Sequence, residues 1–209
     1  MTYGFSHRCR LRSTAIVLIL ATLLGVASCR SSRTGEFEIL GPADETDEAA
    51  KLVQSANQDL QQIKLLYNKN EDKREEIKKA LEANNAEEVK KASNDVIDAI
   101  NEGFDFGKSA VDKIGQAEEM KINDDYREYL RLKEEALKKQ MEAFEEYRQA
   151  ARTLRNNYDP KNAELHNKVK EDFKTRSENY AKIMEKARDL SNQANELAKD
   201  ALRKQQAGS

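Results

Sequence analysis

The chain has 209 residues, with 36 basic and 38 acidic side chains, two prolines and no tryptophan. That length suits one domain behind a short N-terminal segment. Its well-mixed charge excludes the one-sided basic surface that nucleic-acid binding requires. Charged residues make up 35% of a chain that is rich in Ala, Glu, Lys, Leu and Arg. This composition is typical of long helices or of a coiled coil.

The first 28 residues have the three parts of an export signal. A basic head with three arginines (residues 8–12) is followed by an apolar run (residues 15–26), and then by Ala27 and Ser28 in front of Cys29. An apolar run of about 7–15 residues behind a basic head is typical of a secretory signal. A membrane-spanning helix would need about 20 apolar residues. The alternatives are an uncleaved signal anchor and an ordinary signal that is cleaved without lipidation.

The segment Leu24-Gly25-Val26-Ala27-Ser28-Cys29 resembles the lipobox of bacterial lipoproteins. The resemblance implies cleavage between Ser28 and Cys29, a diacylglyceryl group on the thiol of Cys29 and an N-acyl chain such as palmitate on its new amine. Two or more acyl chains hold a protein firmly at a membrane, whereas one chain binds only marginally. The expected location is therefore the cell envelope, outside the cytoplasm. Arg30 stands where an aspartate would mark inner-membrane retention, which favours the outer membrane if the organism has one.

The lipobox divides the chain into three expected parts: a cleaved signal (1–28), a lipidated cysteine with a flexible tether (29–43) and a helical domain (44–206). Cleavage would remove Cys9 and lipidation would consume Cys29, which leaves no thiol for a disulfide. The tether contains two glycines and a proline and shows no helical period. A segment of this composition behaves as a flexible spacer.

From Asp44 onward, apolar residues recur at alternating steps of three and four, which predicts amphipathic helices. Asp44 is expected to cap the first of them, since an aspartate side chain accepts from free N–H groups at a helix start. The apolar seam of this helix continues to Leu81, but Asn70 and Arg74 interrupt it. The sequence leaves open whether the helix breaks near residues 68–70.

Turn-forming residues mark three further helix boundaries. These lie at residues 82–85, 123–124 and 156–160. We expect Asn84 or Asn85 to cap the second helix. Asp159 is expected to cap the fourth helix, with Pro160 at its first helical position.

Four helices of about 33–45 residues joined by short turns predict an all-α fold, a long antiparallel helical bundle. At 1.5 Å per residue the bundle would be roughly 50–60 Å long. The sustained three-four spacing predicts coiled-coil-like packing. The alternatives are a more open three-helix arrangement and a coiled coil that a second copy completes.

Two glycines lie one turn apart inside the second predicted helix, at Gly103 and Gly107. Each costs roughly 1 kcal/mol relative to alanine in a helix interior, so a structural reason for them is expected. One interpretation is a close approach of two helices or a local bend. The other is a pocket lined by Phe104 and Phe106.

Two arginines interrupt apolar seams, Arg74 in the first helix and Arg176 in the last. A buried arginine needs a compensating partner, usually a carboxylate. Each is therefore expected to reach a surface acid along the helix, to fix the register of packing, or to bind an anionic ligand.

Four tyrosines of the third helix and its exit either line the edge of the core with wet hydroxyls or form a binding face for sugar or peptide. They are Tyr126, Tyr129, Tyr147 and Tyr158. His166 is the sole histidine after the signal, and Ala163 stands where a Glu-x-x-His metal motif needs glutamate. We therefore expect no metal site, and we expect His166 to be a solvated first-turn residue.

The functional expectation is an envelope lipoprotein whose helical bundle is an interaction or structural module without catalytic activity. The alternative is an extracytoplasmic ligand-binding or sensory bundle that acts through a partner. No catalytic residue and no cofactor is expected apart from the covalent lipid on Cys29. The expected partners are membrane lipid, through the anchor, and an envelope protein or a second copy of the chain. Nucleic acid is not expected to bind.

Overall fold

The computed structural model describes residues 44–207, apart from the side chains at positions 69–71, 202 and 205–207. The signal, the lipidated Cys29 and the tether predicted for residues 1–43 lie outside this range. Within it the chain forms four α-helices: α1 (Thr46–Glu82), α2 (Ala86–Glu118), α3 (Asp124–Asn157) and α4 (Ala163–Ala207). Across residues 44–207, no helix combines the length and the apolar character that crossing a membrane requires.

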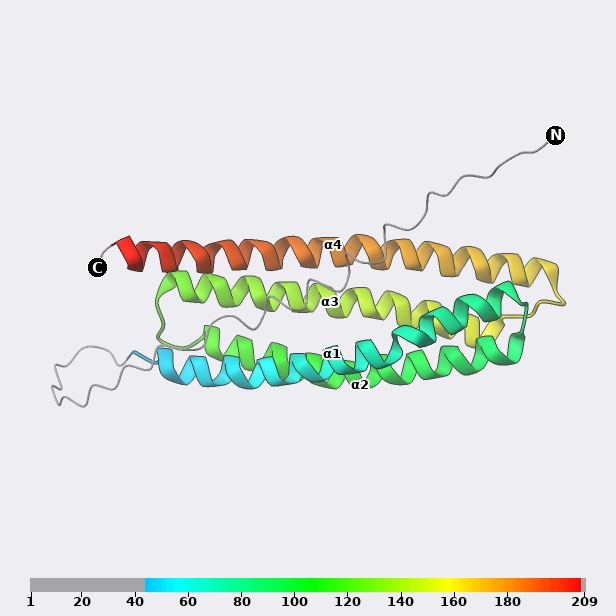
Figure 1. Cartoon of the computed structure of the whole chain (residues 1–209), viewed down its shortest axis with the longest axis horizontal. Helices are drawn as coiled ribbons and strands as arrows, with labels where there is room; N and C mark the ends of the chain where they lie inside the picture. The colour runs from blue at the N-terminus through cyan, green and yellow to red at the C-terminus, as the bar shows by residue number, and fades with distance from the viewer. Residues whose placement is uncertain (1–43, 208–209) are drawn as a thin grey trace, which may run out of the picture. The chain divides into compact units, whose positions relative to one another are not determined.

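The four helices pack as an antiparallel bundle, in which each runs opposite to the one before it (Figure 1). The predicted all-α fold and its division into four long helices are confirmed. The helices have 37, 33, 34 and 45 residues. At 1.5 Å per residue α4 extends about 67 Å, longer than the expected bundle, because it continues without interruption to Ala207.

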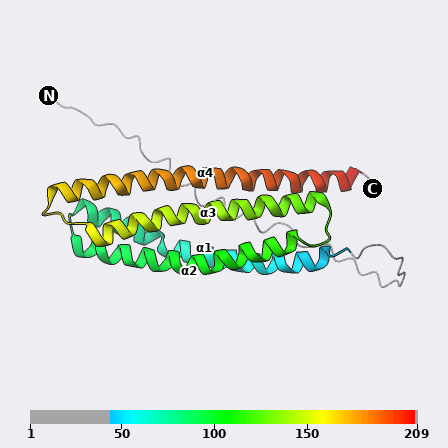
Figure 2. The same ribbon diagram turned by 180° about the vertical axis from the view of Figure 1, so that it is seen from behind.

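Extensive contacts join the helices that follow one another in the chain: α1 with α2, α2 with α3, and α3 with α4. The first and last helices are not paired in this way within the described residues, so the bundle is open along one side. α1 remains helical through its interrupted seam, and the break that the sequence left open does not occur. Its second half changes direction relative to its first half (Figures 1 and 2).

The buried side chains form two cores, one in each half of the bundle. The four-helix core draws on the second half of α1, the first half of α2, the second half of α3 with its exit, and the start of α4. Its members are Ile77, Ala80, Val89, Ala92, Val96, Ile97, Tyr147, Ala151, Leu154, Tyr158 and Val169.

The three-helix core lies in the other half of the bundle. It is formed by the first half of α1, the second half of α2, the α2–α3 loop and the first half of α3. Its members are Ala49, Ala56, Ala110, Ile114, Ala117, Ile122, Leu130 and Leu137. None of the described α4 residues belongs to it. α4 runs beside this half while its extensive contacts are with α3.

Asparagine side chains begin two of the helices. Asn85 Oδ1 accepts from the N–H of Glu88 at 3.3 Å at the start of α2, and Asn123 Oδ1 accepts from the N–H of Tyr126 at 2.8 Å at the start of α3. Asn84 has φ of +52°, a left-handed conformation that asparagine tolerates better than most residues and that ends α1. The prediction of a turn at residues 82–85 is confirmed.

The start of α4 differs from the prediction. Asn162 Oδ1 accepts from the N–H of Leu165 at 3.1 Å, so Asn162 and not Asp159 caps the helix. Asp159 Oδ1 accepts instead from the N–H of Lys161 at 2.9 Å, which closes a turn that contains Pro160. Both residue types cap helices equally well, and this local turn moves the start of α4 to Ala163.

The α2–α3 loop is held by side chains from both sides. Arg127 donates to the carbonyl oxygens of Glu118 at 3.3 Å, Met120 at 3.2 Å and Ile122 at 3.2 Å. Glu45 Oε2, next to the start of α1, accepts from the N–H of Lys121 at 2.7 Å. These bonds use backbone groups at a helix end and a loop that would otherwise need water. They close the end of the three-helix core.

Candidate functional site

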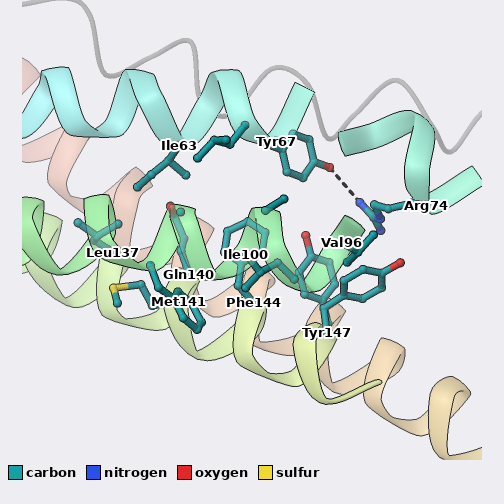
Figure 3. Close-up of a pocket in the computed structure, with 15 residues that line it drawn as sticks. Ile63, Tyr67, Arg74, Val96, Ile100, Leu137, Gln140, Met141, Phe144 and Tyr147 are labelled. Atoms are coloured by element: carbon teal, nitrogen blue, oxygen red, sulfur yellow. Dashed lines mark hydrogen bonds between the residues drawn. The ribbon is translucent and has the colours of Figure 1, made fainter. Parts of the chain in front are cut away.

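A pocket lies in the middle of the bundle, where the two cores meet (Figure 3). Its cavity volume is about 70 Å³, and a single water molecule needs roughly 10–15 Å³. All four helices contribute to its wall, which is mostly aliphatic and aromatic. The lining residues are Ile63, Leu66, Tyr67, Arg74, Val96, Ala99, Ile100, Gly103, Phe104, Leu137, Gln140, Met141, Phe144, Tyr147 and Tyr180.

Gly103 and Gly107 of α2 have different surroundings. A Cβ at Gly103 would meet no atom within 4 Å, so its missing side chain leaves open space beside the pocket. A Cβ at Gly107 would lie 3.0 Å from Sδ of Met141 on α3. The side chain of Met141 therefore packs directly over Gly107, where α2 meets α3, while Gly103 belongs to the pocket wall. Phe104 also lines the pocket, and Phe106 does not.

The pocket is elongated along the bundle. On α1 its wall extends from Ile63 to Arg74, a rise of about 16 Å at 1.5 Å per residue. Figure 3 shows Ile63 and Leu137 at one end and Arg74 beside Tyr147 at the other. The cavity is therefore a narrow channel between helices, with its cationic group near one end.

Four aromatic rings from three helices form the wall at and near the Arg74 end. Tyr67 of α1 and Phe144 of α3 have centroids 6.4 Å apart, and Phe144 lies 6.0 Å from Tyr180 of α4. Tyr147 of α3 and Tyr180 lie 5.7 Å apart at an interplanar angle of 53°. Tilted and edge-on arrangements of this kind are favourable between aromatic rings. They join α4 to α1 through α3 at the position where α1 bends.

Arg74 lies against this aromatic wall. Its Nη1 donates to the hydroxyl of Tyr67 at 3.1 Å, and its Cζ lies 4.9 Å from the ring centroid of Tyr147 and 5.7 Å from that of Tyr180. None of the described acidic side chains forms an ion pair with it. Sequence reasoning expected a carboxylate at this position, and the structure places tyrosines there, because tertiary packing brings rings from α3 and α4 to the seam of α1.

The tyrosines and Arg74 affect one another's protonation. Burial alone would lower the pKa of Arg74, but Tyr147, Tyr180 and Tyr67 raise it, and the net pKa is above its ordinary value. Burial raises the pKa of Tyr180 to about 12, although Arg74 opposes this shift. The guanidinium is therefore charged, and the phenols of Tyr147 and Tyr180 are neutral, at any physiological pH.

Arg176 lies outside the pocket wall, on α4. Its Nε is 3.1 Å from Oδ2 of Asp172, and its Nη1 is 3.4 Å from Oε2 of Glu146 on α3. This arginine thus has the acidic partners that Arg74 lacks among the described side chains. Of the four positions that the sequence singled out for packing or a pocket, the structure brings Gly103 and Phe104 to one cavity.

The tyrosines of α3 do not form one face. Tyr126 and Tyr129 stack at 6.2 Å beside the three-helix core, while Tyr147 and Tyr158 are buried in the four-helix core. His166 packs on the ring of Tyr158 with centroids 5.3 Å apart. It is half-buried, and not solvated as expected, because the turn at residues 158–162 folds the start of α4 back onto the end of α3.

The sequence did not predict that Arg74 packs against several aromatic rings, although the spacing of one of these residues pointed to it. Tyr67 and Arg74 are seven residues apart, a spacing that places both on one face of a helix. Tyr180 comes from a distant segment, and no local pattern connects it to Arg74. Within residues 44–207, no group of three or more His, Cys, Asp or Glu side chains is arranged to hold a metal ion.

Comparisons with protein-family models, with curated proteins and with solved structures found no match to this chain.

Proposed function

We propose that the protein is a lipid-anchored lipoprotein of the bacterial cell envelope and that its helical bundle is a non-catalytic interaction or structural module. The observation that carries this proposal is the lipobox-like segment that ends at Cys29 behind a basic head and a short apolar run. The helical bundle begins 17 residues later, at Thr46. A tether of that length between anchor and bundle would leave the bundle free to meet a partner near the membrane surface.

The proposal includes an envelope protein or a second copy of the chain as partner. The outer membrane is favoured if the organism has one, because Arg30 follows the cysteine. Among the described residues, Leu65 of α1 is a large hydrophobic side chain that is 62% exposed. A photo-crosslinking residue at position 65 in intact cells would capture a partner that uses this face of α1.

Membrane fractionation of a matched pair of cysteine variants tests the anchor. Cys29→Ala should release the chain from the membrane fraction or leave it as an unprocessed precursor, since no thiol remains for the diacylglyceryl group. Cys9→Ala should be processed and retained like the unchanged chain, because Cys9 lies in the segment that is removed. Normal processing and membrane retention of Cys29→Ala would contradict the proposal.

A second candidate function is a ligand-binding or sensory bundle outside the cytoplasm that acts through a partner. The observation that favours it is the elongated pocket between the two cores, with Arg74 near one end. Small-molecule sites are typically apolar cavities with a few polar groups that orient the ligand. Displacement of a bound small molecule from the purified protein would test this candidate.

A further inference from the structure

We propose that the pocket binds a linear alkyl monocarboxylate, with the carboxylate on Arg74 and the alkyl chain along the channel toward Ile63 and Leu137. This inference rests on the second candidate function and names its ligand class. It is independent of the lipid anchor on Cys29.

The charge of Arg74 points to an anion. A guanidinium offers five N–H donors; one bonds to the hydroxyl of Tyr67 at 3.1 Å, and Tyr147 and Tyr180 also interact with the group. The rings and hydroxyls of Tyr147 and Tyr180 stabilise the cation, but they are neutral and leave its positive charge unbalanced. A carboxylate fits this plane in a two-bond fork. The hydroxyl of Tyr67, which accepts from Arg74, still has its own hydrogen to donate to the same carboxylate.

The shape of the cavity points to a linear chain. From the Arg74 end the wall continues past Ile100 to Ile63 and Leu137 (Figure 3). This path has a length of about 16 Å along α1, while the cavity volume is about 70 Å³. A compact ring would not extend from Arg74 to Ile63 along this path. An alkyl chain can follow it and bury its methylenes against aliphatic and aromatic side chains.

A single charge fits the site better than a phosphate dianion. One guanidinium and the three neutral phenols of Tyr67, Tyr147 and Tyr180 are the polar groups at this end, and the remaining wall residues are apolar apart from Gln140. A phosphate dianion would bring two negative charges to the single positive charge of Arg74, and unpaired charge in an apolar cavity is costly. A neutral alcohol would leave the charge of Arg74 without compensation.

The test is equilibrium dialysis of the full-length chain in lipid nanodiscs, with empty nanodiscs as the background. The probes are butyrate, hexanoate and octanoate, with 1-hexanol as the uncharged match to hexanoate. We expect one site per chain and an affinity that rises about fourfold for each added methylene from butyrate to hexanoate. Hexanoate should bind at least about tenfold more tightly than 1-hexanol, the ratio expected of one charge-assisted contact.

Three variants separate the head of the ligand from its chain. Arg74→Gln should weaken hexanoate binding at least about tenfold and leave 1-hexanol unchanged. Gly103→Leu should weaken both probes, because a side chain at Gly103 enters open space beside the cavity. Arg176→Gln is the control, since Arg176 lies outside the pocket and its loss should change neither affinity. Circular dichroism would show that each variant remains folded.

The outcomes distinguish this inference from the function on which it rests. If 1-hexanol binds as tightly as hexanoate, or if Arg74→Gln has no effect, the carboxylate assignment is wrong while the pocket remains a binding site. If neither probe binds and Gly103→Leu changes nothing, the ligand-binding function fails together with the inference. Neither result bears on the proposed lipid anchor, which is tested separately by the Cys29→Ala variant.

Discussion

The four-helix core and the three-helix core are built from different kinds of residues. The four-helix core contains the large side chains of Tyr147, Leu154 and Tyr158, which fill the space between four helices. In the three-helix core, four of the eight members are alanine, and small residues let α1, α2 and α3 approach closely without a fourth helix. The bundle therefore changes its packing along its length.

The pocket lies at the transition between these two arrangements. Its wall includes Leu137 of the three-helix core and Val96 and Tyr147 of the four-helix core. At this position α1 changes direction (Figure 1) and α2 has a glycine without a side chain to fill the space. A cavity at such a transition follows from the two packing modes, because neither set of side chains fits the space of the other.

The largest expected change in the free energy of unfolding comes from a leucine-to-alanine substitution made once in each core. Leu154 and Leu130 are both 1% exposed, one in the four-helix core and one in the three-helix core. Leu154→Ala should lower the free energy of unfolding by about 4 kcal/mol and Leu130→Ala by about 3 kcal/mol, within the range for buried leucine. The difference is expected because four surrounding helices relax less into a cavity than three. Urea unfolding of the full-length variants would measure it, and a larger loss for Leu130→Ala would reverse the comparison.

The free energy of unfolding should depend on pH through Lys133, which lies where α3 packs on α4. Lys133 is 7% exposed, donates to Oδ1 of Asn195 at 2.8 Å and lies over the ring of Tyr129. Burial lowers its pKa from 10.5 to about 8. Between these two pH values the unfolded chain binds more protons than the folded one, so stability should rise as pH increases from 8 to 10.5. Below pH 8 the full cost of burying the charge is present.

Lys133→Met should remove this rise, which amounts to on the order of 2–3 kcal/mol. Other groups titrate in the same window, so the measurement is the difference between the variant and the unchanged chain in urea unfolding at pH 7.5 and pH 10. Lys138→Met, which changes an exposed lysine on the same helix, should keep the rise. A Lys133→Met protein with the same pH dependence as the Lys138→Met protein would show that Lys133 does not carry it.

The smallest expected changes in stability come from substitutions at Gly103 and Gly107 of α2. Gly107→Leu should destabilise the fold by about 1–3 kcal/mol, since the new side chain would collide with Met141 where α2 and α3 approach. Gly103→Ala should stabilise the fold by up to about 1 kcal/mol, because it meets no neighbour and raises helix propensity. Thermal unfolding would measure both shifts. Equal shifts of the same sign would mean that the close approach and the pocket are not distinct features of α2.

The sequence was sufficient for the elements but not for their packing. Turn residues placed the ends of α1, α2 and α3 because their caps are local interactions, as at Asn85 and Asn123. The start of α4 was misplaced by a few residues, since Asp159 and Asn162 are both competent caps and only the turn geometry decides between them. Helical spacing fixes which face of a helix is buried, but not which helix covers it.

The same limit applies to the candidate site. Two unusual glycines drew attention to the part of α2 that forms the pocket wall, because a glycine inside a helix is costly whatever surrounds it. Arg74 was visible as an interruption of an apolar seam, but its partners were not. Tyr147 and Tyr180 reach it from α3 and α4 only after the bundle has formed. The lack of extensive contacts between the described parts of α1 and α4 could not be predicted either, because it depends on how distant segments pack.

The most direct test of the proposed function is the mass of the mature protein isolated from native membranes. We predict a chain that begins at Cys29 and carries the added mass of a diacylglyceryl group and an N-acyl chain on that residue. The N-terminal peptide should be found only with this modification. A protein that begins with an unmodified Met1, or with an unmodified Cys29, would contradict the account.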